Sequence, residues 1–137
     1  MSLFNVLDIA GSGMSAQALR LNTTASNMAN AESVSSSSAA TYRARQPVFS
    51  AVMKALGDNP AGVGVQVKGI VESQAPLRKQ FEPGHPMADA EGYIYLPNVS
   101  MVEEMANMIS ASRSYQSNSE VAKTSKQLLM RTLTLGD

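Results

Sequence analysis

Residues 2–30, SLFNVLDIAGSGMSAQALRLNTTASNMAN, decide the fold because their small and apolar residues recur at alternating steps of three and four. This alternation places one stripe along a single face of a helix, and its strict form is typical of coiled coils. The stripe consists of Phe4, Leu7, Gly11, Met14, Ala18, Leu21, Ala25 and Met28. The stretch therefore predicts a helix of about 28 residues, capped by Ser2, that packs along a partner helix.

The end of the chain repeats this pattern. Residues 97–137 carry a second stripe, which consists of Met101, Met105, Met108, Ser112, Tyr115, Ser119, Ala122, Lys126, Leu129 and Leu133. Two long terminal helices with matching stripes favour antiparallel pairing or a bundle, with the middle of the chain as an insert. Glu103 and Glu104 fall in the first turn of the second helix, where acidic residues complement the helix dipole. We expect both to be solvated charges.

Both helices also have apolar residues away from their stripes. These residues are Val6, Ile9, Ala16 and Leu19 in the first helix, and Val121, Leu128 and Leu135 in the second. A helix that is apolar on more than one side needs cover on more than one side, which a single partner helix cannot provide. Gly11 lies on the first stripe, and we expect another backbone to approach closely there.

The segment between the helices changes character twice. Residues 31–41, AESVSSSSAAT, have the composition of a flexible linker, and we expect a solvated loop, with ordering against neighbouring subunits as the alternative. From residue 42 to 96 the pattern has period two, in YRARQPVF (42–49), VGVQVKGIV (63–71) and GYIYL (92–96). This pattern predicts about four short strands in a small sheet that leans on the helices or on neighbours.

The chain therefore reads as an α+β protein in which two long terminal α-helices pair as a coiled-coil-like unit around a small β-rich insert. Its expected segments are an N-terminal helix (1–30), a Ser-rich linker (31–41), a small β-rich domain (42–96) and a C-terminal helix (97–137).

The composition excludes several classes of function. Eleven basic and eleven acidic residues give a formal charge of zero, which argues against nucleic acid or an anionic membrane surface as the partner. Cysteine is absent, which excludes disulfides and thiolate metal sites. The first basic residue is Arg20, so we expect no secretory signal peptide, and no apolar run reaches the roughly 20 residues of a membrane span.

No arrangement of residues predicts catalysis. His85 is the single histidine and lies between two prolines in EPGHPMAD (82–89), so we interpret it as part of a rigid turn. Arg43 and Arg45 beside Tyr42 form too small a basic group to indicate nucleic-acid binding. With no nucleophile motif and no phosphate-binding loop, we expect no catalytic residue, no cofactor-binding residue and no metal ligand.

Several motifs together carry a family resemblance. They are IAGSGMSAQ (9–17), SNMANA (26–31), YRARQPVF (42–49), EPGHPMAD (82–89), GYIYLPNV (92–99), EEMANMISASRSYQSN (103–118) and TLTLG (132–136). In this order they resemble the bacterial flagellar basal-body rod proteins over nearly the whole chain. The short length and the PGHP turn followed by GYIYLPN are similar to the proximal-rod members of that family.

The resemblance implies a structural function. Such proteins are exported unfolded through the flagellum's own type III apparatus, without a cleaved signal. They polymerise in the periplasm into the shaft that links the membrane-embedded base to the hook, and they transmit torque. Their partners would be other rod proteins and the basal-body base, with no cofactor, no nucleic acid and no membrane insertion. The terminal helices would line the inner tube, and the middle segment would face outward.

The stripes and the matching motifs together suggest a set of assembly contacts. These are Leu7, Gly11, Met14, Leu21, Asn27, Asn30, Met105, Met108, Arg113, Tyr115, Asn118, Leu129 and Leu133. Two other readings of the sequence remain open. One is a secreted two-helix adaptor that docks a single partner through its methionine-rich second helix, and the other is an enzyme with a site around His85.

Overall fold

A computed structural model describes residues 2–56 and 59–135 of the chain. Its elements follow in the order α1 (Leu3–Asn30), β1 (Arg45–Leu56), β2 (Asn59–Glu72), β3 (Arg78–Phe81), β4 (Tyr93–Leu96) and α2 (Met101–Thr134). Two long terminal helices thus enclose a β-rich middle, which confirms the predicted α+β class.

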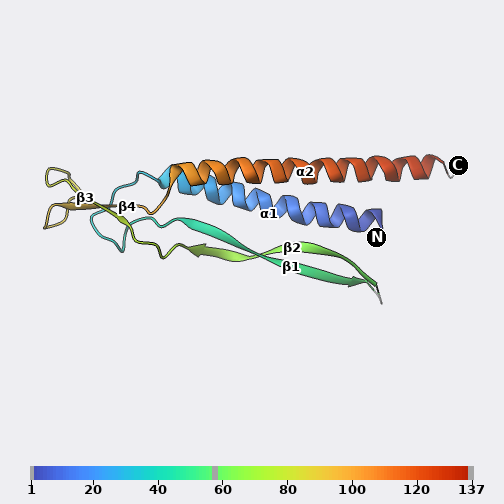
Figure 1. The fold of residues 1–137 in the computed structure, drawn as a ribbon, viewed down its shortest axis with the longest axis horizontal. Helices are drawn as coiled ribbons and strands as arrows, with labels where there is room; N and C mark the ends of the chain where they lie inside the picture. Colours follow the sequence, from blue (N-terminus) through green and yellow to red (C-terminus); the bar gives the residue numbers. More distant parts are fainter. Residues whose placement is uncertain (1, 57–58, 136–137) are drawn as a thin grey trace.

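The molecule is long and has α1 at its centre (Figure 1). α1 and α2 run antiparallel, so the two termini lie at the same end, and α2 extends past the first residues of α1. The β1–β2 hairpin lies along the side of α1 away from α2, while β3 and β4 lie at the opposite end from the termini. The antiparallel helix pair expected from the two stripes is therefore confirmed.

α1 begins at the predicted cap Ser2, and α2 begins after a cap at Ser100. The Ser2 hydroxyl accepts a hydrogen bond from the backbone N–H of Phe4 at 3.3 Å, and the Ser100 hydroxyl accepts one from Glu103 at 3.5 Å. Such a cap satisfies one of the N–H groups that have no partner inside the first helical turn. The local sequence thus sets where each helix starts.

The predicted strands form two separate sheets instead of one. β1 and β2 pair as a long antiparallel hairpin of 12 and 14 residues, and β3 and β4 pair as a short one at the far end. The β1–β2 register shifts between Val48 and Phe49, opposite Gly69, whose φ of +157° suits glycine. Period-two alternation located the strands, but it does not determine which strands pair.

Residues 31–41 are only partly the solvated loop that their composition predicts. Residues 36–40 are exposed, whereas Ala31, Ser35 and Thr41 are buried. Ser35 exchanges two backbone hydrogen bonds of 3.0 Å with Tyr95 in β4. The segment therefore orders against the chain's own β4 at this point, an outcome that composition alone does not indicate.

The hairpin supplies the second cover that α1 was expected to need. A side chain at Gly62 would collide with Ile9, and the Ser12 hydroxyl accepts a hydrogen bond from the N–H of Val65 at 3.1 Å. Ala16, on the same side of α1, is 2% exposed. The chain's own hairpin therefore covers the side of α1 that carries Ile9, Ser12 and Ala16.

The core of the folded chain is thin. Its buried apolar residues among those described are Ala10, Ala16, Ala31, Ala44, Ile94, Pro97, Val99 and Ala111, most of them alanine. The accessible surface is 9076 Å², whereas a compact protein of 14.5 kDa exposes about 6,900 Å². The chain buries much less of itself than a globular domain of this mass does.

Candidate assembly interface

The face of α2 that meets α1 differs from the predicted stripe. Its buried residues recur every seven positions: Glu104 is 5% exposed, Ala111 0% and Ser125 5%, and Asn118 in the same series faces Gly13. The predicted positions 105, 112, 119 and 126 follow this series by one residue, or about 100° around the helix. The prediction that the stripe of α2 would meet α1 is therefore wrong for Met105, Ser119 and Lys126, which are exposed. Met108, Ala122 and Leu129 of the same stripe are half-buried.

Small and polar residues lie between α2 and α1 because they let the two helices approach closely. A Cβ added at Gly13 would lie 2.7 Å from Asn118 Nδ2, so a side chain there has no room unless Asn118 moves. A Cβ added at Gly11 would meet no atom within 4 Å. The close contact expected at Gly11 thus occurs at Gly13 within the chain, and Gly11 remains open.

Most of the larger apolar residues of α2 are exposed, and those near its two ends form two groups. The N-terminal apolar patch of α2 consists of Met101, Val102, Met105 and Ile109, and the C-terminal apolar patch of α2 consists of Leu128, Met130, Leu133 and Leu135. Their exposed fractions run from 37% for Met101 to 86% for Leu135. α2 therefore buries small and polar residues and exposes large apolar ones, the reverse of a self-sufficient helix pair.

Glu104 is the main surprise on the inner face of α2. It was expected to be solvated, but it is buried and lines a cavity of about 170 Å³ that Arg20 and Arg45 also line. Arg20 donates to Asn107 Oδ1 at 3.0 Å, and within the described residues the Glu104 carboxylate has no hydrogen bond or ion pair. The signal that could have revealed its burial is its seven-residue spacing to Ala111.

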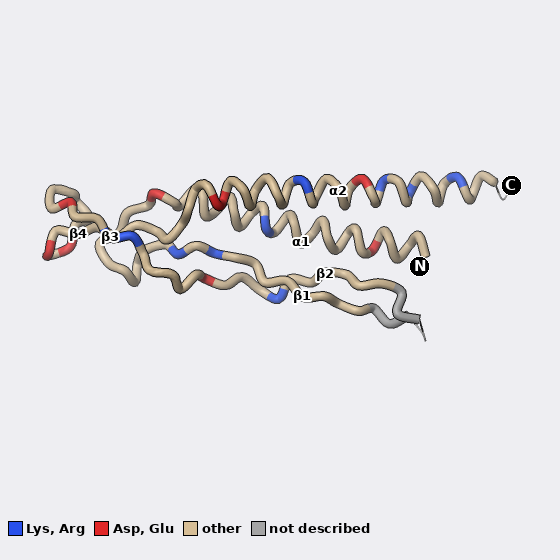
Figure 2. Tube along the Cα trace, in the orientation of Figure 1, with Lys and Arg blue, Asp and Glu red and all other residues tan. Residues whose placement is uncertain are grey.

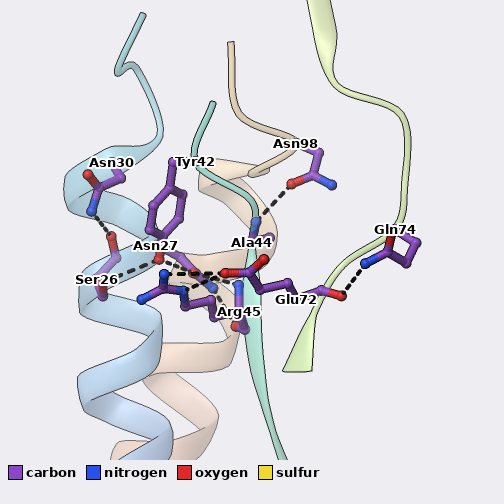
Figure 3. A network of polar contacts seen from close by, with 9 residues as sticks. All are labelled: Ser26, Asn27, Asn30, Tyr42, Ala44, Arg45, Glu72, Gln74 and Asn98. Carbon is purple, nitrogen blue, oxygen red and sulfur yellow. Dashed lines mark hydrogen bonds and ion pairs between the residues drawn. The ribbon is translucent and has the colours of Figure 1, made fainter. Parts of the chain in front are cut away.

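Asn27 joins the end of α1 to the start of the hairpin (Figure 3). Its side chain is 1% exposed, and its Oδ1 accepts hydrogen bonds of 2.9 Å from the Arg45 N–H and from the Tyr42 hydroxyl. Its Nδ2 donates to the Arg45 carbonyl at 2.8 Å. The amide thus binds both backbone groups of Arg45, as a neighbouring strand would.

Asn98 holds the same segment from the other side (Figure 3). Its Oδ1 accepts from the Ala44 N–H at 2.8 Å, and its Nδ2 donates to the Ala75 carbonyl at 2.9 Å. Arg45 also pairs with Glu72 at 3.3 Å, although both side chains are about half exposed, so this ion pair adds little. Two asparagines therefore fix the angle at which the hairpin leaves the helices.

The structure distributes the predicted assembly residues over three environments. Met105, Arg113, Tyr115 and Leu133 are exposed; Leu7, Gly11, Met14, Leu21, Asn30, Met108, Asn118 and Leu129 are half-buried; Asn27 is buried. Asn27 and Asn118 contact residues of their own chain, as described above. The exposed members lie on α2, where a second chain can reach them. Sequence reasoning missed Val102 and Ile109, which neighbour the stripe and are more exposed than Met105.

The loop between β3 and β4 is stabilised by its own polar groups. His85 Nδ1 accepts a hydrogen bond from the Met87 N–H at 3.0 Å, in keeping with its interpretation as a turn residue. Hydrogen bonds from the backbone N–H of Tyr93 and, to a smaller extent, of Glu91 hold the pKa of Asp89 below its ordinary value, although partial desolvation opposes them. Among the described residues no three metal-binding side chains gather.

Neither described helix combines the length and apolarity that a membrane crossing requires. The two apolar patches of α2 are separated by about five helical turns, and Tyr115 and Val121 are exposed between them. This spacing suits several contacts along the helix better than one compact pocket.

Comparison with known proteins gives two family matches, one in each terminal region. Residues 7–34 match a family described as flagella basal body rod protein, and residues 90–135 match one described as flagellar basal body rod FlgEFG protein C-terminal. These regions contain most of α1 and the whole of β4 and α2.

Full-length relatives agree with these matches. The chain is 54% identical over 136 residues to the flagellar basal-body rod protein FlgC of Yersinia enterocolitica, and 53% identical to that of Salmonella typhimurium, with 99% of each chain covered. It is 34% identical to FlgC of Borreliella burgdorferi, with 98% of each chain covered. The chain therefore belongs to the family of flagellar basal-body rod proteins that includes FlgC.

Proposed function

We propose that this chain is a structural subunit of the proximal rod of the bacterial flagellum, which polymerises through its terminal helices and transmits torque from the motor to the hook. The observation that carries the polymerisation is the reversed surface of α2. Glu104, Ala111 and Ser125 are buried within the chain, whereas the N-terminal apolar patch is open to solvent. Removing apolar surface from water is the main favourable term in association, so further chains complete this helix pair.

We further infer that the subunit acts in the periplasmic part of the rod and reaches it through the flagellar type III apparatus without a cleaved signal. Its partners there are other rod proteins and the basal-body base. The thin, alanine-rich core supports this route, because a chain with little internal burial unfolds at low cost before it passes through a narrow channel.

Substitutions on two neighbouring positions of α2 test the polymerisation. Ile109 is 56% exposed in the N-terminal apolar patch, and the exposed Ser110 lies about 100° away on the polar side of the helix. In a flagellated bacterium whose own proximal-rod gene is replaced by this one, we expect Ile109→Glu to abolish swimming and to leave basal bodies without a rod. Ser110→Glu introduces the same charge and should leave both intact.

The purified variants separate assembly from folding. Since Ile109 is largely exposed in the single chain, Ile109→Glu should keep the helical circular dichroism and thermal melting of the unsubstituted protein. Normal swimming with Ile109→Glu would show that the N-terminal apolar patch is no contact of the rod. A stable one-to-one complex with one soluble partner, and no polymer, would instead favour the adaptor.

A further inference from the structure

The sulfur of this chain is all in methionine. The sequence contains nine methionines and neither cysteine nor tryptophan, so thioethers are the side chains that a peroxide oxidises most readily. Among the described residues, the exposed methionines are Met53, Met87, Met101, Met105 and Met130. An oxidant in the surrounding solution can therefore reach these sulfurs in the folded chain.

Two of the exposed thioethers lie together in the N-terminal apolar patch of α2. Met101 and Met105 are 37% and 49% exposed, and Ile109 of the same patch is 56% exposed. Residues four positions apart lie on the same side of a helix, so these three side chains form one row. Methionine therefore supplies much of the apolar surface that the patch offers to another chain.

Met108 is a covered thioether on the same helix. It lies three residues after Met105 and is half-buried, on the side of α2 that carries the buried Glu104 and Ala111. α2 thus contains an open and a partly covered methionine within one helical turn, and the two differ mainly in their access to solvent.

The patch offers no charged partner to a new polar group. Residues 105–112 contain no lysine, arginine, aspartate or glutamate, and Figure 2 shows this stretch of α2 without charged residues. A thioether sulfur is a weak hydrogen-bond acceptor, whereas a sulfoxide is strongly polar. Burying a polar group against apolar surface without a hydrogen bond opposes association. Oxidation at Met105 would therefore weaken any contact that covers the patch.

We propose that Met101 and Met105 are an oxidation site of the unassembled subunit, at which hydroperoxides form sulfoxides that keep the subunit out of the rod. The sulfur lone pair attacks one oxygen of the hydroperoxide, and the O–O bond breaks. The sulfur loses two electrons and gains that oxygen, whose proton passes to the other oxygen, which leaves as water or an alcohol. The inference rests on the proposed function, and it adds a control over which copies assemble.

Hydrogen peroxide treatment of the purified full-length chain tests the site. Peptide mass spectrometry measures the gain of one oxygen at each methionine over time. In the folded chain, Met101 and Met105 should react at least about threefold faster than Met108, because exposure sets susceptibility. All three should react at similar rates in guanidinium chloride, which removes the cover from Met108. Equal rates in the folded chain would overturn the site.

Substitutions test the effect of polarity on assembly. Glutamine is polar and unbranched like methionine sulfoxide, whereas leucine is apolar and inert to peroxide. In the bacterium used to test the proposed function, Met101→Gln/Met105→Gln should lower the number of basal bodies with a rod at least about tenfold. Met101→Leu/Met105→Leu should leave that number unchanged. Met53→Gln/Met87→Gln makes the same change at exposed methionines outside α2 and should also leave it unchanged.

Peroxide links the chemistry to the assembly. Cells that are building new flagella receive hydrogen peroxide until mass spectrometry detects the sulfoxide of Met105 in the unassembled subunit. Subunits from isolated basal bodies should contain this sulfoxide at a level at least about fivefold lower, because oxidised copies do not enter the rod. Equal levels in the two fractions would contradict the exclusion of oxidised subunits.

The remaining outcomes separate this inference from the proposed function. Normal rod numbers with the glutamine variant, or an equal loss with the leucine variant, overturn the inference and leave the proposed function intact if Ile109→Glu still abolishes the rod. If the unsubstituted chain never builds a rod, the proposed function and the effect on assembly both fall. The oxidation rates of the purified chain would then still decide whether Met101 and Met105 are the reactive site.

Discussion

One amide side chain decides how the hairpin meets the helices. The buried Asn27 side chain accepts two hydrogen bonds and donates one, and two of the three are with the backbone of Arg45. We expect Asn27→Ala to lower the free energy of unfolding by about 2–4 kcal/mol, because the bonds are lost and the Arg45 N–H stays buried without a partner. Urea unfolding followed by circular dichroism measures this change.

Asn30, one turn later, is the matched control. Its Nδ2 donates to the Ser26 carbonyl within the same helix, and no bond to the hairpin depends on it. Asn30→Ala should change the free energy of unfolding by less than about 0.5 kcal/mol. Equal effects of the two substitutions would mean that Asn27 does not act through Arg45.

Asp89 makes the β3–β4 loop sensitive to acid. Its pKa is lowered in the folded chain by the N–H groups of Tyr93 and Glu91, so the folded loop favours the ionised form. The stability that the ionised carboxylate contributes is present above its ordinary pKa, and it is lost as the pH falls through the lowered value. The amide resonances of Tyr93 and Glu91 should therefore titrate together below that ordinary pKa, and Asp89→Asn should abolish this titration.

Residue types predicted some of this chemistry and missed the rest. The Ser2 cap and the turn role of His85 follow from neighbours within a few positions, which a sequence displays directly. The burial of Glu104 depends on which face α2 turns toward α1, so it is a property of two distant segments. Local patterns cannot settle such a property, because propensity and charge favoured a solvated first turn.

Among the secondary-structure elements, α1 offers two glycines with opposite surroundings. A Cβ at Gly11 meets nothing within 4 Å, whereas one at Gly13 meets Asn118 at 2.7 Å. Gly11→Ala should raise the free energy of unfolding by about 0.5–1 kcal/mol, since alanine favours the helix. Gly13→Ala should gain less or lose stability, because Asn118 must move. Thermal melting of the single chains compares the two.

The same pair tests the predicted role of Gly11 in assembly. If the backbone of a neighbouring subunit approaches Gly11 in the rod, Gly11→Ala should block rod formation despite its more stable single chain. Swimming cells with Gly11→Ala would remove this position from the assembly contacts. A more stable single chain that builds no rod would separate the effect of Gly11→Ala on folding from its effect on assembly.

Periodicity identified the elements better than their faces. The three-four alternation gave both helices and their antiparallel pairing, and the period-two stretches located β1, β2 and β4. It placed Met105, Ser119 and Lys126 against α1, although they are exposed, because two stripes one residue apart both have heptad spacing. Hydrophobicity favoured Met105 over Ala111, while close packing favoured the smaller residue.

At the scale of the whole molecule, surface area distinguishes this chain from a globular domain. Large apolar residues from Phe4 to Leu135 are exposed on both helices and on the hairpin. We expect the dilute chain to bind the apolar dye ANS and to melt over a broad temperature range, because unfolding exposes little additional apolar surface. Dye binding should fall as the chain assembles. A sharp, cooperative transition without dye binding would contradict this account.

The central position of α1 has a mechanical consequence. α2 and the β1–β2 hairpin each pack on α1 and, within the described residues, not on each other. A twisting load applied to the hairpin therefore reaches α2 in series, through α1 and the asparagine junction. In a series linkage the compliances add, so the stiffness of a shaft built from such units would not exceed that of the segment formed by its first thirty residues.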